Sequence, residues 1–221
     1  MPLFTLSSPL YLATANSGKL REFRHAAAAR GITVEAVPGM ESLPACLEDG
    51  STFEANARKK AMHYSAYISG PVFADDSGLS VDALGGAPGV FSARFAGPGA
   101  TDSDNNRKLL DELHRADEKL RRTETMIEGI SEAEYKPIRR NAHYICVIAL
   151  AQSGRILRVT EGRADGLILN EPRGSRGFGY DPYFFYPPVG KTFAELAPEE
   201  KFAVSHRGEA FRKLLDFLLQ A

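Results

Sequence analysis

The chain has 221 residues, 43% of them hydrophobic and 25% charged, which is the composition of an ordinary globular protein. Lysine and arginine number 27 and aspartate and glutamate 28, so the net charge is −1. This balance gives no overall positive field for nucleic acid or an acidic membrane, and any anionic ligand must be held by a local site.

The sequence contains no apolar run of the roughly 18 residues that a membrane span requires. Its first residues lack a basic segment followed by a long apolar one, so we expect no signal peptide and a cytoplasmic protein. The two cysteines, Cys46 and Cys146, have no metal-ligand spacing. We therefore expect both to be reduced and buried.

The first third of the chain alternates strand and helix patterns. Residues 10–14 and 32–37 are predicted strands, and the helix between them has Asn16 or Ser17 as its cap and Gly31 at its end. A second helix starts near Ser51. A third strand follows at residues 71–75, and this β-α-β-α-β order predicts an α/β sheet.

Further elements follow a glycine-rich stretch. Residues 104–116 have helical periodicity, whereas residues 117–140 are highly charged and are predicted to be a solvated insert or mobile loop. Residues 143–151 and 155–163 are predicted to form a hairpin that turns at Ser153 and Gly154. A strand is predicted at 178–188, and the last helix is expected from about Gly208.

The stretch Thr14–Lys19 leads from a strand into a helix start that carries a lysine. Backbone N–H groups at a helix start favour an anion, and a lysine there suits phosphate. The alternative is a capped helix with a solvated Lys19, and this stretch taken alone favours that alternative.

Asp75 and Asp76 directly follow three apolar residues, where the predicted strand ends. Side chains alternate along a strand, so the two carboxylates cannot enter the same core. Burial of an unpaired carboxylate costs several kcal/mol in round numbers, and Mg²⁺ would relieve this cost. The alternative is a plain Asp-Ser-Gly turn.

Two more acidic residues lie upstream of this pair. Glu48 is placed in a loop from which it could reach a cation, although most loop glutamates are simply solvated. Glu54 lies three residues after Ser51, and a capping box is its expected role.

Two later segments complete a set of candidate ligand-binding groups. GFGYDPYF holds Phe178 on a constrained turn, which suits stacking on a base, although an aromatic edge strand is equally consistent. His206 and Arg207 precede the last helix. They form either an exposed helix start or a pair of donors aimed at a ligand. A phosphate cradle, a carboxylate pair, a stacking aromatic and base-edge donors together predict a nucleotide site.

Five motifs in order, TANSGK, EDGSTFEANARKKA, FADDSGLSVDALGGAPGVFSARFAG, GFGYDPYFF and EEKFAVSHRGEAFRKL, resemble the inosine/xanthosine triphosphate pyrophosphatase family. The resemblance runs from about residue 10 to the end of the chain. It implies a single α/β domain over 1–221, with a long mixed sheet flanked by helices and two lobes around an active-site cleft. It also implies a homodimer that hydrolyses ITP, dITP and XTP to the monophosphate and pyrophosphate with Mg²⁺.

The resemblance also assigns roles to residues. Glu48 and Asp76 hold the metal, and Asp75 is a further candidate ligand. Asp76 and Lys19 are the catalytic residues, Asp76 as the base that activates water. Phe178 stacks on the base, and His206 and Arg207 read its edge. The full set of implied substrate-binding residues is Thr14, Ala15, Asn16, Ser17, Gly18, Lys19, Ser77, Phe178, Gly179, Tyr180, Asp181, Lys201, His206 and Arg207.

Two features depart from the family pattern. Arg176 stands where the family commonly has a glycine, and a positive φ there would strain an arginine. The 117–140 segment is longer than the family usually shows.

Two rival functions stay open: a nucleotide-binding regulatory module without turnover, and another two-carboxylate hydrolase such as a glycosidase. The intact carboxylates and Lys19 argue against the first. The basic residues and the absence of tryptophan argue against the second.

Overall fold

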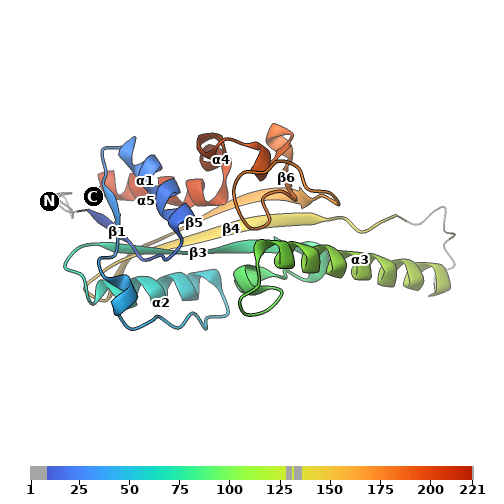
Figure 1. Cartoon of the computed structure of the whole chain (residues 1–221), viewed down its shortest axis with the longest axis horizontal. Helices are drawn as coiled ribbons and strands as arrows, with labels where there is room; N and C mark the ends of the chain where they lie inside the picture. The colour runs from blue at the N-terminus through green and yellow to red at the C-terminus, as the bar shows by residue number, and fades with distance from the viewer. Residues whose placement is uncertain (1–8, 128–130, 132–135, 221) are drawn as a thin grey trace. The chain divides into compact units, whose positions relative to one another are not determined.

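The computed structural model describes residues 9–127, 131 and 136–220. One sheet of seven strands has the order β2-β1-β3-β4-β5-β6-β7 (Figure 1). Its strands are β1 (Leu10–Leu12), β2 (Val34–Ala36), β3 (Val72–Val81), β4 (Asn141–Gln152), β5 (Arg155–Ile168), β6 (Phe184–Tyr186) and β7 (Lys191–Thr192). β1 runs parallel to β2 and β3, and β6 runs antiparallel to β5 and β7. The predicted mixed α/β fold is confirmed.

Five α-helices are described: α1 (Ser17–Ala28), α2 (Phe53–Ser65), α3 (Asp102–Ile127), α4 (Pro198–Val204) and α5 (His206–Gln220). The chain divides into two compact units. Unit 1 comprises Met1–Ser77, Ile145–Ala164 and Pro198–Ala221, so far as these are described, and unit 2 comprises Gly78–Tyr144 and Asp165–Ala197.

In unit 1, helices cover both faces of the strands: α1 and α5 lie on one side and α2 on the other (Figure 1). Alternation along β4 explains the two layers. Cys146, Ile148 and Leu150 pack in the core with α1 and α5, whereas Val147 and Ala149 pack with α2. A strand that is buried on both faces reads as a continuous apolar run, as this one does.

Local signals at both ends of α1 were predicted correctly. The Asn16 side chain accepts a hydrogen bond from the Lys19 N–H at 3.0 Å, which satisfies one of the donors that a helix start leaves open. Gly31 has a φ of +69° just beyond the helix, where a left-handed residue terminates it. The hairpin turn between β4 and β5 is also confirmed, with positive φ at Ser153 and Gly154.

In unit 2, an aromatic cluster forms the core under β6. Tyr144 stacks on Phe193 with ring centroids 5.7 Å apart, and Phe184 lies 4.6 Å from Tyr144. α3 packs on this unit through the fully buried Leu109 and Leu113.

β3 does not end at the carboxylates, so the predicted strand end at residue 75 is wrong, and so is the alternative of a plain Asp-Ser-Gly turn. The strand continues through Gly78 to Val81. Gly78 lies so close to a neighbouring segment that a Cβ there would be 2.7 Å from the Gly89 carbonyl oxygen. The glycine that suggested a turn instead permits a close approach of backbone.

The predicted loop over 117–140 is wrong for its first part, because α3 continues to Ile127. High charge is compatible with a helix whose outer faces are solvated. Residues 128–130 and 132–135 lie outside the described residues. Asp117 accepts a hydrogen bond from the backbone N–H of Ile138 at 2.7 Å, which ties the returning chain to α3.

Three further boundaries differ from the prediction. The N-cap of α2 is Thr52, and Glu54 pairs with Arg58 four residues on, so the capping box with Ser51 is wrong. The last helix begins at His206, after the unpredicted α4. The strand predicted at 178–188 is reduced to β6, because turns occupy residues 179–183.

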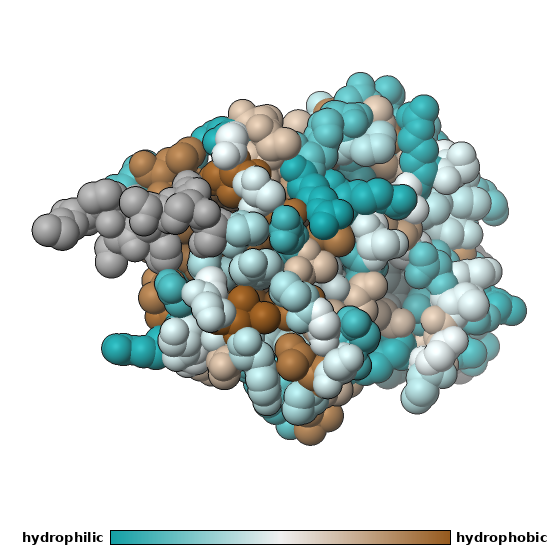
Figure 2. Space-filling view, turned by 60° about the vertical axis from the view of Figure 1, so that its left-hand side comes forward, coloured by the Kyte–Doolittle hydropathy of each residue, from teal (hydrophilic) through white to brown (hydrophobic). Residues whose placement is uncertain are grey.

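Among the described residues, no helix combines the length and the apolar character needed to cross a membrane. On the face drawn in Figure 2, hydrophobic residues appear in separate areas among hydrophilic ones. Cys146 is buried as predicted, but Cys46 is only half-buried, and both are free thiols.

Candidate active site

The side chain of Asp75 points towards α1 and α5, because its neighbour two residues back, Phe73, belongs to the core on that side of the sheet. Its carboxylate is 1% exposed and its Oδ2 atom lies 2.7 Å from the Lys19 Nζ. Burial alone would raise the pKa of this carboxyl. Nearby cations, chiefly Lys19 and Arg207, instead lower the pKa to about 2. Asp75 is therefore ionised, and the alternative of a solvated Lys19 is wrong.

Asp76 points to the opposite face, as the alternation predicted. Its Oδ2 atom accepts a hydrogen bond from the Asn56 side chain on α2 at 2.9 Å, and its Oδ1 accepts from the Ser77 N–H at 3.0 Å. Burial raises the pKa of Asp76, and the Asn56 hydrogen bond only partly opposes this effect. The two adjacent carboxylates thus have opposite pKa shifts, which is the pattern of groups with separate chemical tasks.

Glu48 and Asp76 lie within electrostatic reach of each other, because the charge of Glu48 contributes to the raised pKa of Asp76. Lys60 on α2 lies among the acidic groups: its Nζ is 2.7 Å from Glu48 Oε2 and 3.2 Å from the carbonyl oxygen of Asp75. Burial disfavours the charged form of Lys60, yet Asp75 and the other carboxylates raise its pKa overall. The surroundings therefore favour the protonated, positively charged form of Lys60.

This donor set fits a hard divalent cation. Glu48 and Asp76 supply carboxylate oxygens on the α2 side of β3, whereas Asp75 lies on the other side with Lys19. The described residues contain no group of three or more His, Cys, Asp or Glu side chains arranged as a metal site. Mg²⁺ is commonly held by one or two carboxylates together with substrate phosphates, so two protein ligands suffice for it.

The Thr14–Lys19 stretch forms the N-terminus of α1. The Thr14 hydroxyl accepts a hydrogen bond from the Asn16 N–H at 3.1 Å, and residues Ala15, Asn16 and Ser17 are exposed. The first N–H groups of a helix have no acceptor within it. The start of α1 therefore has exposed residues next to Lys19, as an anion-binding helix start requires.

α4 and α5 bring Lys201, His206 and Arg207 to the same region of unit 1. All three are buried, so the alternative of an exposed helix start is wrong. Arg207 donates from Nη1 to Glu22 Oε2 at 2.8 Å and from Nη2 to Ser77 Oγ at 3.3 Å. Burial and the neighbouring cations, Arg207 first, hold the pKa of His206 well below its usual range. Its imidazole is therefore neutral at neutral pH.

In unit 2, residues Phe178–Asp181 form a tightly held turn. The buried Asp181 accepts from the Phe178 N–H at 2.9 Å, and the Tyr180 hydroxyl donates to the Ser92 carbonyl at 2.8 Å. The N-terminal part of α3 secures the middle of the turn, since Asn106 donates to the Gly179 carbonyl at 2.9 Å. The turn leaves the Phe178 ring half-buried, as a stacking platform requires.

The substitution of Arg176 does not strain this turn. The left-handed conformation belongs to Gly177, with a φ of +77°, and among the described non-glycine residues only Ser153 has a positive φ. A Cβ at Gly177 would collide with the Asp181 carboxylate, so this glycine, not its neighbour, is the required one.

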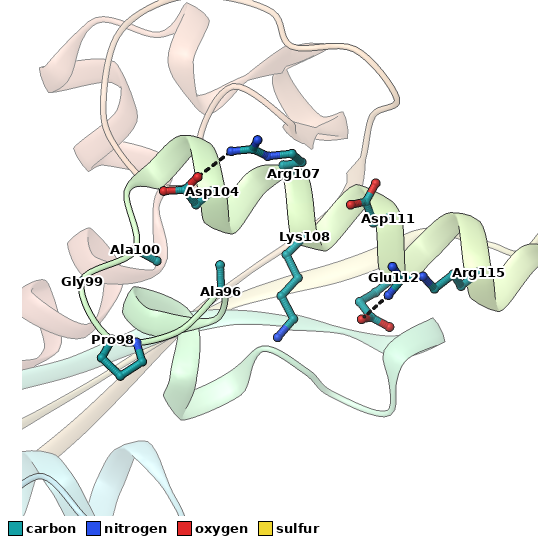
Figure 3. A pocket seen from close by; sticks show the side chains of 10 residues that line it. All are labelled: Ala96, Pro98, Gly99, Ala100, Asp104, Arg107, Lys108, Asp111, Glu112 and Arg115. Carbon is teal, nitrogen blue, oxygen red and sulfur yellow. Dashed lines mark hydrogen bonds and ion pairs between the residues drawn. The ribbon is translucent and has the colours of Figure 1, made fainter.

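Unit 2 also has an open recess of about 570 Å³ beside α3 (Figure 3). Its charged residues include the ion pairs Arg107–Asp104 and Arg115–Glu112, and Lys108 donates to the Phe95 carbonyl at 2.7 Å. None of the candidate site residues named from the sequence lines it. Its three positive and three negative side chains balance, so it has no preference for an anion.

Sequence reasoning missed Asn56, Lys60 and Glu22, which hold the site together. Asn56 carried a usable signal, because it is a polar residue next to the predicted buried Ala57 and is itself 2% exposed. Lys60 and Glu22 carried none, since both look like ordinary charged residues of amphipathic helices.

Residues 10–217 match the Ham1 family. The chain belongs to this family. A dITP/XTP pyrophosphatase of Geobacillus kaustophilus is 45% identical over 205 residues, which cover 93% of this chain and 91% of the relative. One of Desulfotalea psychrophila is 42% identical, with coverage of 93% and 82%. A solved HAM1 protein from Coxiella burnetii is 40% identical, covers 96% of this chain and 99% of its own, and has a TM-score of 0.79. The resemblance inferred from the five motifs is confirmed.

Proposed function

We propose that this protein hydrolyses deaminated purine nucleoside triphosphates, namely ITP, dITP and XTP, to the nucleoside monophosphate and pyrophosphate. The observation that carries the proposal is the carboxylate pair of β3, in which Asp75 is ionised against Lys19 and Asp76 has a raised pKa. Relatives of more than 40% identity named dITP/XTP pyrophosphatase support the choice of substrate. The proposed enzyme removes these nucleotides from the cytoplasmic pool and works as a homodimer, as the resemblance implies.

We further propose Mg²⁺ as the cofactor, held by Glu48 and Asp76. Asp75 faces the opposite side of β3 and pairs with Lys19, so the further ligand role considered for it is not proposed. When bound, it neutralises phosphate charge and orients the substrate. The protein groups divide the remaining work. The start of α1 and Lys19 bind the triphosphate, and Lys19 stabilises the charge that develops on the leaving pyrophosphate.

Asp76 accepts the proton of the attacking water. This carboxylate lies on the α2 side of β3, away from the ion pair of Asp75 with Lys19. Its two oxygens are oriented by Asn56 and by the Ser77 N–H, so the base is held in place before the substrate arrives. Cleavage of the anhydride bond between the α and β phosphates then gives the monophosphate and pyrophosphate.

Recognition of the base is assigned to Phe178 by stacking and to His206 and Arg207 by hydrogen bonding. Hypoxanthine and xanthine have a keto oxygen at C6, which accepts, whereas adenine has an amino group there, which donates. An arginine can only donate. A site built around such a donor rejects the mismatched base by as much as roughly 10⁴-fold.

One assay separates this function from its rivals. The protein is incubated with ITP and Mg²⁺, and pyrophosphate and orthophosphate are measured separately, with ATP in place of ITP and with EDTA as controls. We expect stoichiometric pyrophosphate and inosine monophosphate, with little product from ATP or in EDTA. Binding without turnover would identify a regulatory module, and orthophosphate as the sole phosphate product would identify a different hydrolase.

A further inference from the structure

The segment that carries Glu48, residues 44–50, belongs to no helix or strand. Side chains of α2 that lie one helical turn apart hold it. Taken along α2, these contacts join Asn56 to Gly50, Lys60 to Glu48 and His63 to Pro44. The position of Glu48 therefore depends on side chains of α2 and not on a backbone ladder.

Asn56 joins this segment to the second carboxylate proposed to hold the metal. Its Oδ1 accepts from the Gly50 N–H at 2.7 Å, and its Nδ2 donates to Asp76 Oδ2 at 2.9 Å. A backbone N–H can only donate and an ionised carboxylate can only accept, so the two bonds together require this one orientation of the amide. Asn56 is 2% exposed, and water therefore does not compete with either bond.

The close approach of the segment to Asn56 depends on Gly50. A Cβ at this position would lie 2.6 Å from Asn56 Oδ1 and 2.9 Å from Ala55 Cβ, so a residue without a side chain is needed here. Glu48 lies two residues earlier, and its side chain is 38% exposed, so burial does not fix it. One amide thus holds both the segment of Glu48 and an oxygen of Asp76.

We propose that Asn56 is a positioning residue that sets the distance between Glu48 and Asp76 and thereby the affinity of the site for a divalent cation. The inference rests on the proposed Mg²⁺ site. Groups that orient metal ligands without touching the metal typically change metal affinity by roughly 10- to 100-fold. The competing explanation is structural: Asn56 would merely fasten residues 44–50 to α2.

Two matched controls exist for that explanation. Asp49 pairs with Lys59 of α2, and the Pro44 carbonyl oxygen lies 2.7 Å from His63 Nε2. Asp49→Ala and His63→Ala each remove a tie between the same segment and α2, but neither removes a group that contacts Asp76 in the described structure. A fastening role predicts that both controls lose as much metal affinity as Asn56→Ala.

The experiment titrates Mn²⁺ into the metal-free protein without nucleotide and follows free Mn²⁺ by electron paramagnetic resonance. Mn²⁺ takes the same oxygen ligands as Mg²⁺. The Kd and the number of sites are measured in the wild type, Asn56→Ala, Gly50→Ala and the two controls. The Kd is the decisive readout, because partial unfolding lowers the number of sites and not the affinity of those that remain.

We expect the Kd to rise by about tenfold or more in Asn56→Ala. It should also rise in Gly50→Ala, because the added methyl group displaces the Asn56 amide while leaving that side chain in the protein. The controls should stay within about twofold of the wild type. An unchanged Kd in Asn56→Ala overturns the inference, and so do controls that lose as much affinity. If Asn56→Ala does not fold, an unchanged Kd in Gly50→Ala overturns it.

Amide hydrogen exchange tests the same link without metal or substrate. Gly50 lies outside the helices and strands, so the bond to Asn56 is what protects its N–H. We expect slow exchange at Gly50 in the wild type and in both controls, and fast exchange in Asn56→Ala. If the wild type binds Mn²⁺ but releases no pyrophosphate from ITP, the proposed function fails while the Kd values still test the positioning. Fast exchange at Gly50 in the wild type overturns the positioning whatever the activity.

Discussion

At the scale of single residues, two neighbouring aspartates acquire different properties from the faces on which they lie. Asp75 faces α1 and α5, where cations lower its pKa to about 2. Asp76 faces α2, where burial raises its pKa and the Asn56 amide is its hydrogen-bond partner. Successive side chains of a strand point to opposite faces. This alternation alone separates the carboxylate that pairs with Lys19 from the carboxylate proposed to accept a proton.

The first prediction concerns Asp76→Asn. The substitution keeps the shape but removes the charge that both the metal and the attacking water require. We expect the kcat for ITP to fall by about 10²-fold or more, as is typical of the loss of a general base. Steady-state kinetics with pyrophosphate detection measures it.

Asp49→Asn is the matched control for that variant. Asp49 is an exposed aspartate that pairs with Lys59 on α2, so this variant should keep wild-type turnover. If Asp76→Asn retained turnover within about threefold of the wild type, Asp76 would not be the base.

How far the residues of the site could be predicted depends on where their partners lie. Asp75, Asp76 and the Thr14–Lys19 stretch are recognisable because local sequence shows strand, turn and helix start. Glu22 was not, because its partner Arg207 is 185 positions away. A single sequence shows that a residue is charged but not which distant charge it will meet.

At the scale of elements, a glycine within β3 allows the strand to extend past a closely packed neighbouring segment. Gly78 continues the strand past the carboxylates and brings it against the segment of Gly89 and Ser92. Ser92 reinforces the contact, because its hydroxyl accepts from the Leu79 N–H at 2.9 Å.

The second prediction is that Gly78→Ala destabilises the protein by about 1–3 kcal/mol, the usual cost of forcing extra volume into a packed site. The added methyl group would meet a backbone carbonyl that cannot rotate away. Urea unfolding followed by circular dichroism measures the change. An unaltered free energy of unfolding would show that β3 does not approach this segment so closely.

The third prediction concerns the end of α3 and the segment after it. Ile138 hydrogen-bonds to Asp117, so the chain can be rejoined there. Replacing residues 119–136 by a short Gly-Ser turn removes charged residues such as Lys119 that make little core. We expect the free energy of unfolding to change by less than about 1 kcal/mol and ITP hydrolysis by less than threefold.

Asp117→Ala combined with the same excision is the companion variant, because it also removes the tie to Ile138. It should be less stable than the excision alone. A collapse of activity, or of the oligomeric state in size-exclusion chromatography, in an excision variant that stays folded would show that the segment is functional.

Element types were easier to predict than element boundaries. The order of strands and helices in unit 1 follows from hydrophobic periodicity. The ends were misjudged where a local signal had two uses: Gly78 resembles a turn residue but serves a close contact, and the charges of 117–127 resemble a loop but cover a helix. Tertiary contacts decide such cases, and one sequence does not reveal them.

At the scale of the whole molecule, a nearly neutral chain also carries a nearly neutral candidate site. Within the described part of unit 1, the acidic groups Glu22, Glu48, Asp75 and Asp76 are matched by the cations Lys19, Lys60, Lys201 and Arg207. Four charges of each sign leave this region close to neutral. A triphosphate with its metal can enter it without an opposing net field, although the chain has a net charge of only −1.

The last prediction is a dependence of global stability on pH that arises from His206. Burial lowers its pKa, and the cations that face it, Arg207 on α5, Lys201 on α4 and Lys19 on α1, lower it further. In the unfolded chain the same histidine titrates near 6.5. Below that pH the histidine binds a proton in the unfolded state but stays neutral in the folded state. The free energy of unfolding therefore falls as the pH falls.

Above about pH 7.5 the contribution of His206 to the free energy of unfolding is constant. Below pH 6.5 this contribution falls by up to about 1.4 kcal/mol for each pH unit. Urea unfolding of the wild type and of His206→Asn between pH 7.5 and 5.0 isolates it, because all other titrating groups are shared. We expect the wild type to lose about 2 kcal/mol more than the variant over this range. Parallel curves would mean that His206 accepts a proton in the folded protein, and the neutral imidazole assigned to the base-recognition site would then be wrong.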